Sequence, residues 1–314
     1  MRPSLALLLL LSLPASGLRA EPGGTAAATL RRPLTARPVG MGEAFAAVDG
    51  GLDSLGYNPA GAGRLKKPEL GTSYLRGAAG DDFGFLGYSH PFPLATLTGA
   101  MVYYNAGTIE LNLSDGTRGP RTAQQDMVGL LSAALPLGAG LCLGGTAKFY
   151  RFELAQEARA AGFAGDLGAV WHTPLSGLNL GAAIQNLGPD VRYESVGDPL
   201  PSAARFGAAY DFSLAKLRYF SEGGFSFNRF LVTADAVKPR DQRSVLPSTG
   251  LEMGMSLGDA SDMALRFGYL FERDIANFTF GAGFRQGRWR LDYGLGVGRD
   301  DVESTHHVTL GARF

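Results

Sequence analysis

Side chains able to carry catalysis are few in this sequence, which holds four histidines and one cysteine. The nearest approach to a nucleophile with its general base is a serine close to a histidine, at Ser89 and His90 and at Ser304 and His306. A Walker loop, an HExxH zinc motif and a CxxC pair do not occur. The sequence therefore predicts no enzyme, no catalytic residue and no cofactor.

No metal site is predicted either. His306 and His307 are adjacent, so a strand would point them to opposite faces and they could not share one metal ion. Carboxylates gather at 81–82 and at 300–303, where they could hold cations that bridge lipopolysaccharide, although solvated loop charge is the preferred interpretation. The single Cys142 cannot form an internal disulfide, and we interpret it as a small strand residue.

A different kind of chemistry, the burial of an apolar molecule beneath a movable plug, fits the residues near the N-terminus. Residues 40–48 predict a short amphipathic helix whose apolar face carries Met41, Ala44, Phe45 and Val48. Asp53 or Ser54 could cap a further turn, and Asn58 with Pro59 signals a turn or a helix start. Such helices could lie below a barrel or fill its lumen.

Composition narrows the class of protein that must position this segment. The 314 residues carry 29 basic and 29 acidic side chains, so no charge excess points to nucleic acid. Glycine is unusually frequent, with 45 residues scattered among aromatic and aliphatic neighbours. Glycine used in this way suits strands that bend or approach each other closely.

The first twenty residues predict a secretory signal peptide, residues 1–20. Arg2 is followed by an apolar stretch over 5–13, which is too short to span a bilayer, and Pro14 ends it. Ala15 and Gly17 suit cleavage after Gly17, and cleavage after Ala20 is the alternative. The rest of the chain has no second long apolar run. An exported chain can still enter a membrane as a closed barrel.

Fourteen segments show the alternation of apolar and polar residues that barrel strands require. In the last of them Val308, Leu310 and Phe314 share one face, while His307 and Thr309 share the other. The segments lie near 69–77, 82–90, 94–105, 126–136, 141–152, 162–172, 178–187, 204–213, 229–238, 250–257, 263–271, 278–285, 289–298 and 307–314, the weakest being 82–90. We therefore predict an all-β fold, a transmembrane antiparallel barrel of about fourteen strands over 69–314, preceded by a helical hatch within 21–68.

The second face of these segments is largely glycine with single charges of both signs, which predicts a polar lumen crossed by ion pairs. The charges are Lys148, Asp166, Arg205, Asp211, Asp235, Glu252, Arg266, Arg285, Arg290, Asp292 and Arg313. Aromatic residues near the strand ends predict membrane-interface girdles: Phe83, Tyr88, Tyr103, Tyr104, Phe149, Tyr150, Trp171, Tyr210, Trp289 and Tyr293. A soluble sandwich or lipocalin-like barrel is the alternative fold. Residues 215–228 interrupt the pattern, either as an insertion on the side of the short turns or because the strand parity slips there.

The run ARPVGMGEAFAAVDGGLDSLGYNPAGAGRL, residues 36–65, closely resembles the N-terminal segment of PorV/PorQ-type outer-membrane proteins, a group related to the FadL family of long-chain fatty-acid transporters. Its Asn58, Pro59, Ala60 and Gly61 look like the NPAG hatch motif of that family. Later phrases that resemble its strands lie at 202–212, 231–241, 264–272 and 278–294. The resemblance implies a fourteen-stranded barrel with an N-terminal hatch. The chain departs from it in being shorter than typical fatty-acid transporters and in residues 215–228.

Two functions follow from this resemblance. The PorV/PorQ likeness implies a non-enzymatic component of type IX-like protein export that binds cargo or another outer-membrane protein. The wider family implies passive transport of a hydrophobic small molecule, such as a long-chain fatty acid, through the hatch and a lateral opening. In that case the hatch or gating residues would be Met41, Phe45, Val48, Leu55, Tyr57, Asn58, Pro59, Ala60 and Gly61.

The resemblance also predicts a cellular location and partners. The resemblance places the chain in the bacterial outer membrane, in contact with outer-membrane lipid. The terminal aromatic Phe314 would act as the assembly signal read by the barrel assembly machinery. Secretion-system proteins or a hydrophobic ligand would be further partners under the two functions, and no nucleic acid is expected.

Overall fold

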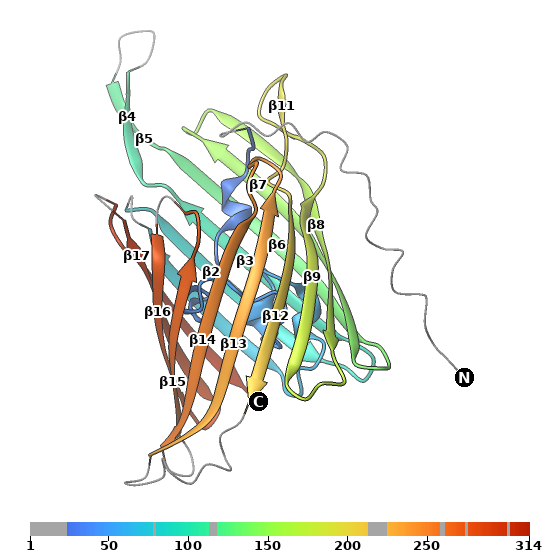
Figure 1. Ribbon diagram of the computed structural model, residues 1–314. Coiled ribbons are helices and arrows are strands. Elements are labelled where there is room, and N and C mark those ends of the chain that lie inside the picture. The colour runs from blue at the N-terminus through green and yellow to red at the C-terminus, as the bar shows by residue number, and fades with distance from the viewer. Residues whose placement is uncertain are drawn as a thin grey trace.

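The computed structural model describes residues 24–77, 80–112, 118–212, 225–257, 261–273, 276–299 and 302–314. The predicted signal peptide, the acidic pair at 300–301 and most of the segment 215–228 lie outside these residues. Within them, fourteen antiparallel strands form a closed barrel (Figure 1). The predicted fold class is confirmed.

Each predicted segment overlaps one strand of the barrel wall, including the weak segment at 82–90. The strands are β1 (Glu69–Arg76), β2 (Asp82–Pro91), β3 (Thr96–Asn105), β6 (Gln124–Pro136), β7 (Leu141–Leu154), β8 (Ala158–His172), β9 (Leu178–Leu187), β12 (Ala203–Phe212), β13 (Phe225–Pro239), β14 (Leu246–Leu257), β15 (Ser261–Leu270), β16 (Ala276–Gln286), β17 (Trp289–Gly298) and β18 (Thr305–Arg313).

The wall closes where the first strand pairs with the last, in the register Glu69↔Arg313 to Arg76↔His306. Two small ribbons lie outside the wall. The hairpin of β4 (Thr108–Asn112) and β5 (Arg118–Thr122) projects beyond one end of the barrel, and β10 (Val191–Arg192) pairs with β11 (Gly197–Asp198) at the same end (Figure 1). Closure pairs the first strand with the last, so neither terminal strand presents a free edge to lipid.

The two ends of the barrel differ in their connections. One end carries the short turns 92–95, 137–140, 173–177 and 287–288, and we call it the periplasmic end because periplasmic turns are short. Longer connections, at 106–123 and 188–202, lie at the opposite, outer end. β12 pairs directly with β13, from Ala203↔Pro239 to Phe212↔Phe230. The strand parity therefore does not slip between β12 and β13.

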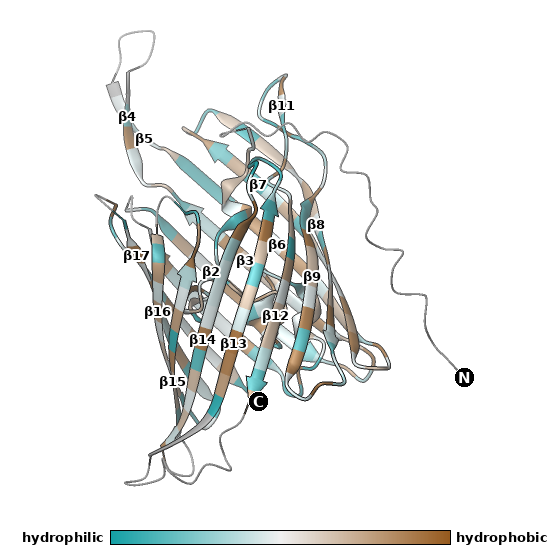
Figure 2. Cartoon of the chain, in the orientation of Figure 1, coloured by the Kyte–Doolittle hydropathy of each residue, from teal (hydrophilic) through white to brown (hydrophobic). Residues whose placement is uncertain are grey.

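The outer surface of the wall is apolar, as the alternation predicts. Figure 2 shows apolar and polar residues alternating along the strands, and outward side chains such as Leu131 and Phe206 are 62% and 63% exposed. Since these exposed side chains ring a closed barrel, lipid is the solvent that they suit. The architecture is that of a bacterial outer-membrane protein. No helix in the described part of the chain is long and apolar enough to cross a bilayer.

Residues 24–68, hereafter the hatch, lie inside the lumen. They form the short turns η1 (Ala28–Arg31), α1 (Ala36–Gly40), η2 (Gly51–Ser54) and η3 (Pro59–Ala62). α1 packs on β15–β18, η2 on β1 and β2, and η3 on β6–β8. Of the two positions considered for this segment, it takes the one inside the barrel, because fourteen strands enclose more space than wall side chains can fill.

The predicted helix over 40–48 is wrong in position. The α-helical turn is Ala36–Gly40, and residues 41–48 run through turns instead. Gly42 and Glu43 adopt positive φ values of 59° and 55°, which a right-handed helix cannot accommodate. Asp53 and Ser54 lie within η2, so neither caps it from outside. The turn signal at Asn58 is confirmed, because η3 starts at Pro59 with Asn58 as its N-cap.

The predicted assembly signal can be tested at the last residue. Phe314 is 54% exposed, and its backbone amide donates to the carbonyl oxygen of Pro68. We expect Phe314→Ala to slow barrel assembly several-fold while leaving the thermal stability of the finished barrel nearly unchanged, because the ring contributes little to the core. The measurement is the heat-modifiable, folded fraction in outer membranes after a pulse of expression. Phe284→Ala, another outward phenylalanine, is the control, and equal assembly rates for both variants would contradict the prediction.

Candidate functional site

The predicted hatch residues form two groups rather than one. Met41, Phe45, Val48 and Tyr57 are buried in one apolar cluster with Ala47, Ala209 of β12 and Leu231 of β13. The ring centroids of Phe45 and Tyr57 are 5.8 Å apart. The residues therefore meet as expected, but across turns rather than on one helix face. Leu55 belongs to a separate cluster described below.

The NPAG turn fastens the hatch to the wall through one fully buried amide. Nδ2 of Asn58 donates to the carbonyl oxygens of Ala46, at 2.7 Å, and Ala169 of β8, at 2.9 Å. Its Oδ1 accepts from the backbone amide of Ala60, at 3.1 Å, which starts η3. One side chain thus joins the hatch to itself and to the wall, so the predicted gating residue holds the hatch in place.

Two close approaches explain why glycine flanks this turn. A β-carbon at Gly144 of β7 would lie 2.3 Å from the amide nitrogen of Ala60. One at Gly61 would lie 2.5 Å from both the Ser54 hydroxyl oxygen and the Val48 carbonyl oxygen. These distances are shorter than atomic contact allows, so the turn can lie against the wall only because both positions lack a side chain.

The outer half of the lumen is apolar on one side, which corrects the prediction of a polar lumen. We call this region the outer chamber. Its buried side chains come from the hatch, from the outer halves of β1–β3 and β6–β8, and from the connection 188–202: Ala27, Leu34, Leu52, Leu55, Leu75, Phe83, Phe85, Val102, Tyr104, Val128, Leu130, Tyr150, Phe152, Ala160, Ala164, Val191 and Leu200.

Three aromatic residues predicted for the membrane girdles line this chamber instead. Phe83, Tyr104 and Tyr150 are 1%, 8% and 5% exposed. Tyr150 stacks on Phe152 with ring centroids 4.5 Å apart and planes 7° apart. The other seven girdle candidates, among them Trp171 and Trp289, are on the outward face. Alternation alone could not separate the two groups, because both faces of these outer strand ends are apolar.

Hatch side chains nearly fill the chamber. The remaining cavity is about 20 Å³, and its lining combines the apolar Leu30, Leu34, Val102, Val128 and Leu130 with Thr29, Arg32, Gly56 and Lys148. Ligand cavities for small organic molecules are typically about 300–1,000 Å³, so an aromatic molecule could enter only if hatch side chains moved.

Residues at the outer mouth tie this part of the hatch to the rim. Arg31 pairs with Asp241 at 2.6 Å, Arg32 pairs with Asp81 at 2.6 Å, and the hydroxyl of Thr29 donates to Asp126. Burial alone would raise the pKa of Asp241, but its hydrogen bond from Arg31 and the charge of that guanidinium lower it below the usual value. The Arg31 and Arg32 side chains stay partly exposed, at 32% and 28%, so solvent weakens both pairs.

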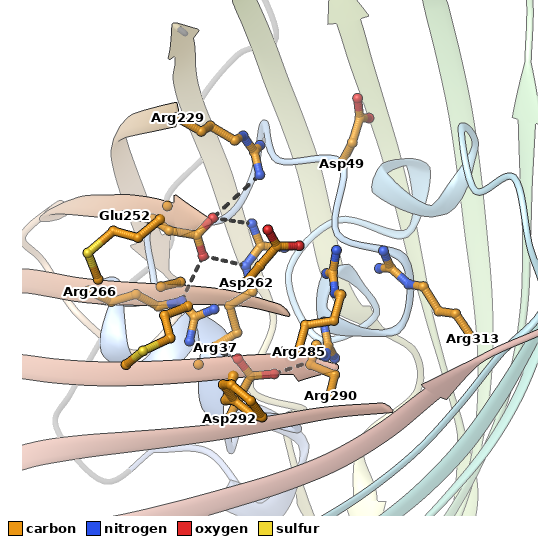
Figure 3. A pocket seen from close by; sticks show the side chains of 16 residues that line it. Arg37, Asp49, Arg229, Glu252, Asp262, Arg266, Arg285, Arg290, Asp292 and Arg313 are labelled. Atoms are coloured by element: carbon orange, nitrogen blue, oxygen red, sulfur yellow. Dashed lines mark hydrogen bonds and ion pairs between the residues drawn. The ribbon is translucent and has the colours of Figure 1, made fainter. Parts of the chain in front are cut away.

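The other side of the lumen, along β14–β18, is charged, as predicted (Figure 3). Glu252 of β14 accepts from Arg37 of the hatch at 2.7 Å and from Arg266 of β15 at 2.7 Å. The chain of pairs continues from Arg266 to Asp292 at 2.8 Å and from Asp292 to Arg290 at 2.9 Å.

Arg290 returns this network to the hatch by pairing with Asp53 at 2.7 Å. These side chains are at most 9% exposed. The charges lost from water are therefore compensated chiefly by one another, with Glu69 near Arg290 at 3.5 Å and Arg229 near Glu252 at 3.6 Å as further partners. We call Arg37, Asp53, Glu252, Arg266, Arg290 and Asp292 the ionic network.

Two further pairs fix the hatch where the ionic network does not reach. Asp235 of β13 accepts from the backbone amides of Phe45 and Ala46, at 2.9 and 3.0 Å, and from Arg205 of β12 at 3.1 Å. At the periplasmic end, Nε2 of His172 bonds Asp49 of the hatch at 2.8 Å. Sequence reasoning identified Arg205 and Asp235 as lumen charges, but the pattern held no sign that His172 meets the hatch.

The serine–histidine neighbours do not assemble. Ser89 bonds Thr98 inside the barrel, whereas His90 bonds Tyr88 on the other face. A short GxSxG match around Ser256 lies along strand β14 and not at the strand-to-helix turn that a nucleophile elbow requires. His306 is exposed and His307 buried, as expected for adjacent strand residues. Among the described residues, no group of three or more potential ligands could hold a metal ion.

The wall beside the outer chamber is incompletely paired. β8 pairs with β7 over its full length, but with β9 only from Gly165 to His172. The remaining outer residues of β8, 158–164, face the connection 188–202, which contributes Val191 and Leu200 to the chamber. A loop rather than a strand therefore covers the chamber on this side.

Solved structures of outer-membrane proteins share this fold. The structure resembles the Ralstonia pickettii toluene transporter TbuX, with a TM-score of 0.59 and 14% identity over 90% of this chain and 99% of that chain. The P. putida toluene transporter TodX gives a TM-score of 0.60 and 12% identity over 89% and 98%. The chain has the fold of these transporters.

A Pseudomonas aeruginosa FadL homologue is similar as well, with a TM-score of 0.51 and 10% identity over 93% of this chain and 99% of that chain. No protein-family model matches the sequence, and no curated protein matches it. This likeness shows the fold alone, so transport of hydrophobic molecules stays a prediction. The PorV/PorQ resemblance and the export role stay predictions.

The anchoring role of Asn58 gives a first test. Asn58→Ala leaves the carbonyl oxygens of Ala46 and Ala169 without their donor, so we expect the free energy of unfolding to fall by about 3 kcal/mol. The hatch should also become sensitive to protease before the barrel unfolds. Denaturant unfolding and limited proteolysis of the detergent-purified protein measure the two effects. Asn179→Ala, at a half-exposed asparagine of β9, is the control, and an equally small effect at both positions would contradict the role given to Asn58.

The ionic network gives a second test. Glu252→Gln removes the charge that Arg37 and Arg266 share, which leaves two buried guanidinium groups undercompensated. We expect a loss of about 3–5 kcal/mol in the free energy of unfolding. Glu303→Gln removes the same charge at an exposed position and should change stability by less than about 0.5 kcal/mol. Chemical denaturation of both variants measures these free energies of unfolding, and similar values for the two would show that the network does not hold the hatch.

Proposed function

We propose that the protein is a passive transporter of small hydrophobic molecules across the outer membrane and that the outer chamber is its binding region. The observation that carries this proposal is the apolar cluster between hatch and wall inside the lumen. A lumen used only for water and ions would have no need of buried leucine, valine and aromatic side chains at this position.

The solved structures support the same function. The two toluene transporters share the whole fold with this chain, and toluene is a small apolar ring. A ring of that size buries roughly 150 Å². At about 25 cal/mol per Å², its burial in the chamber would contribute about 4 kcal/mol, which suits a site that must bind and then release.

Movement of the hatch is the step that makes room. The cavity of about 20 Å³ is bounded by Leu30 and Leu34, which belong to the part of the hatch held by partly exposed ion pairs. Displacing these two leucines opens the chamber without disturbing the ionic network on the opposite side. The ligand then lies above the cluster of Phe45 and Tyr57, which separates it from the periplasmic end.

Changing the chamber volume in both directions tests the proposal. Leu34→Ala should raise the affinity for radiolabelled toluene several-fold, because the cavity grows. Val128→Trp should lower the affinity by roughly tenfold, or ~1.4 kcal/mol, because the new ring fills the cavity. Equilibrium dialysis of the detergent-purified, delipidated protein measures both, and native mass spectrometry reports any lipophile retained from the cell.

Leu131→Trp is the matched control, because Leu131 lies on the same strand as Val128 and is 62% exposed on the outward face. It should leave toluene binding unchanged. If Leu34→Ala, Val128→Trp and Leu131→Trp bind toluene alike, the chamber is not the binding region and the proposal is wrong. An empty barrel that retains a protein partner through purification would instead favour the export role.

A further inference from the structure

Two cavities of the lumen-facing surface lie at the periplasmic end, away from the outer chamber. One, of about 270 Å³, lies beneath the ionic network and includes Asp262, Arg285 and Arg313 in its lining. A second, of about 250 Å³, shares Asp49 and Arg313 with it and adds Arg64, Lys66 and Lys67. We call the two together the periplasmic vestibule.

Positive charge exceeds negative charge in this vestibule. The larger cavity is lined by six arginines and four carboxylates: Arg37, Arg229, Arg266, Arg285, Arg290, Arg313, Asp49, Glu252, Asp262 and Asp292. The smaller cavity adds three cations and no carboxylate. A cleft lined by one sign of charge concentrates the field and attracts ions of the other sign.

Most of these arginines already have partners. Arg37 and Arg266 share Glu252, Arg290 pairs with Asp53 and Asp292, and Arg229 pairs with Asp211 at 2.6 Å. Their charges hold the hatch and the wall together, so they are not available to a ligand.

Arg285 and Arg313 differ from the rest. Within the described residues, Arg285 makes no hydrogen bond or ion pair, and its neighbour in register, Asp262, accepts a hydrogen bond from Ser256 at 3.0 Å. Arg313 reaches Glu69 only at 3.4 Å, and its Nε is buried without a partner. The positive charges of Arg313, Arg290 and Arg37 act on Arg285, and the negative charge of Asp262 opposes them. Figure 3 shows the Arg285 and Arg313 side chains extending into the same opening.

We propose that the periplasmic vestibule binds a small oxyanion, a carboxylate or phosphate group, between Arg285 and Arg313. Two guanidinium groups that share a cavity repel each other, and an oxyanion between them converts this repulsion into charge-assisted hydrogen bonds. Each planar guanidinium can present two N–H groups to such an anion. Arg64, Lys66 and Lys67 are exposed at the entrance and would steer the anion inward.

Besides its charged side chains, the larger cavity is lined by the small residues Gly254, Ala264 and Gly283 and by the apolar side chains of Met255, Met263 and Phe284. The vestibule lies on the opposite side of the hatch from the outer chamber, so this site does not depend on the proposed transport function. A free small anion and the headgroup of a phospholipid in the inner leaflet offer the same chemistry.

Inorganic phosphate is a direct probe. Isothermal titration of the detergent-purified full chain, with ionic strength held constant by sodium chloride, should show saturable binding at one site. Arg285→Gln and Arg313→Gln should each weaken that binding by about tenfold or more. The phosphate affinity of Arg285→Lys should lie between those of the wild type and Arg285→Gln, because the positive charge remains but the planar guanidinium is lost. Since Arg285 has no hydrogen-bond or ion-pair partner among the described residues, its variants should fold normally even if Arg313→Gln does not.

Arg288→Gln is the matched control. Arg288 lies in the turn after β16, and its guanidinium packs on the rings of Trp289 and Phe314 at 5.3 and 6.0 Å. It carries the same charge near the same rim but does not line the vestibule. Phosphate affinity should be unchanged in this variant. An equal loss in Arg285→Gln and Arg288→Gln, or no saturable binding to the wild-type chain, would overturn the proposal.

Lipid nanodiscs distinguish the two sources of the anion. If a phospholipid headgroup occupies the vestibule, nanodiscs rich in phosphatidylglycerol should weaken phosphate binding to the wild type relative to phosphatidylcholine, and Arg285→Gln should abolish the difference. If a free anion is the ligand, phosphate should bind equally in both lipids. Both results support the oxyanion site, whereas competition that persists in Arg285→Gln would assign the effect to membrane charge and contradict it.

Discussion

A barrel of fourteen strands encloses more space than its own inward side chains can fill, and this constraint governs the rest of the structure. The hatch supplies the missing volume, but it must also satisfy its own backbone in a lumen with little room for water. Asn58 and Asp235 do so by bonding hatch backbone groups directly. Glycines of the wall, such as Gly144, let the hatch chain approach closely enough to form these bonds. The high glycine content therefore reflects the fit between hatch and wall as well as strand curvature.

Filling the lumen with a chain segment divides it into unlike halves. Along β14–β18 the hatch is held by guanidinium and carboxylate groups, and these must be paired because their burial is otherwise costly. Along β1–β8 the outer half is mainly apolar and is held chiefly by packing, although Lys148 pairs with Asp166 at 2.8 Å and Arg32 with Asp81 at 2.6 Å. One face of the hatch thus resembles the interior of a soluble protein, whereas the other resembles a buried ion-pair lattice. The outer surface gives no sign of this division, since lipid requires apolar residues all round.

The sequence could predict what depends on local periodicity. The alternation of Val308, Leu310 and Phe314 with His307 and Thr309 is the same signal that gave all fourteen strands. Turn chemistry placed Asn58 correctly, because Asn before Pro has a local meaning. The outer chamber could not be predicted from the sequence, because Phe83, Tyr104 and Tyr150 resemble girdle aromatics unless the direction of each side chain is known. The position of α1 could not be predicted either, since the positive φ values at Gly42 and Glu43 depend on how the hatch packs against the wall. Ion-pair partners such as Arg37 and Glu252 are 215 residues apart in sequence, and no local pattern links them.

The unequal strength of the attachments decides which part of the hatch can move. Separating a buried pair such as Arg37 and Glu252 costs about 3–5 kcal/mol, so the ionic network is the fixed part of the hatch. Exposed pairs contribute about 0–1 kcal/mol each, and Arg31 and Arg32 hold the outer residues by pairs of partly exposed side chains. Leu30 and Leu34, which fill the outer chamber, belong to this weakly held part. The chamber can therefore open while the charged half stays closed. That order suits the proposed carrier of apolar molecules, because a ligand could enter the outer chamber without breaking the buried pairs of the ionic network.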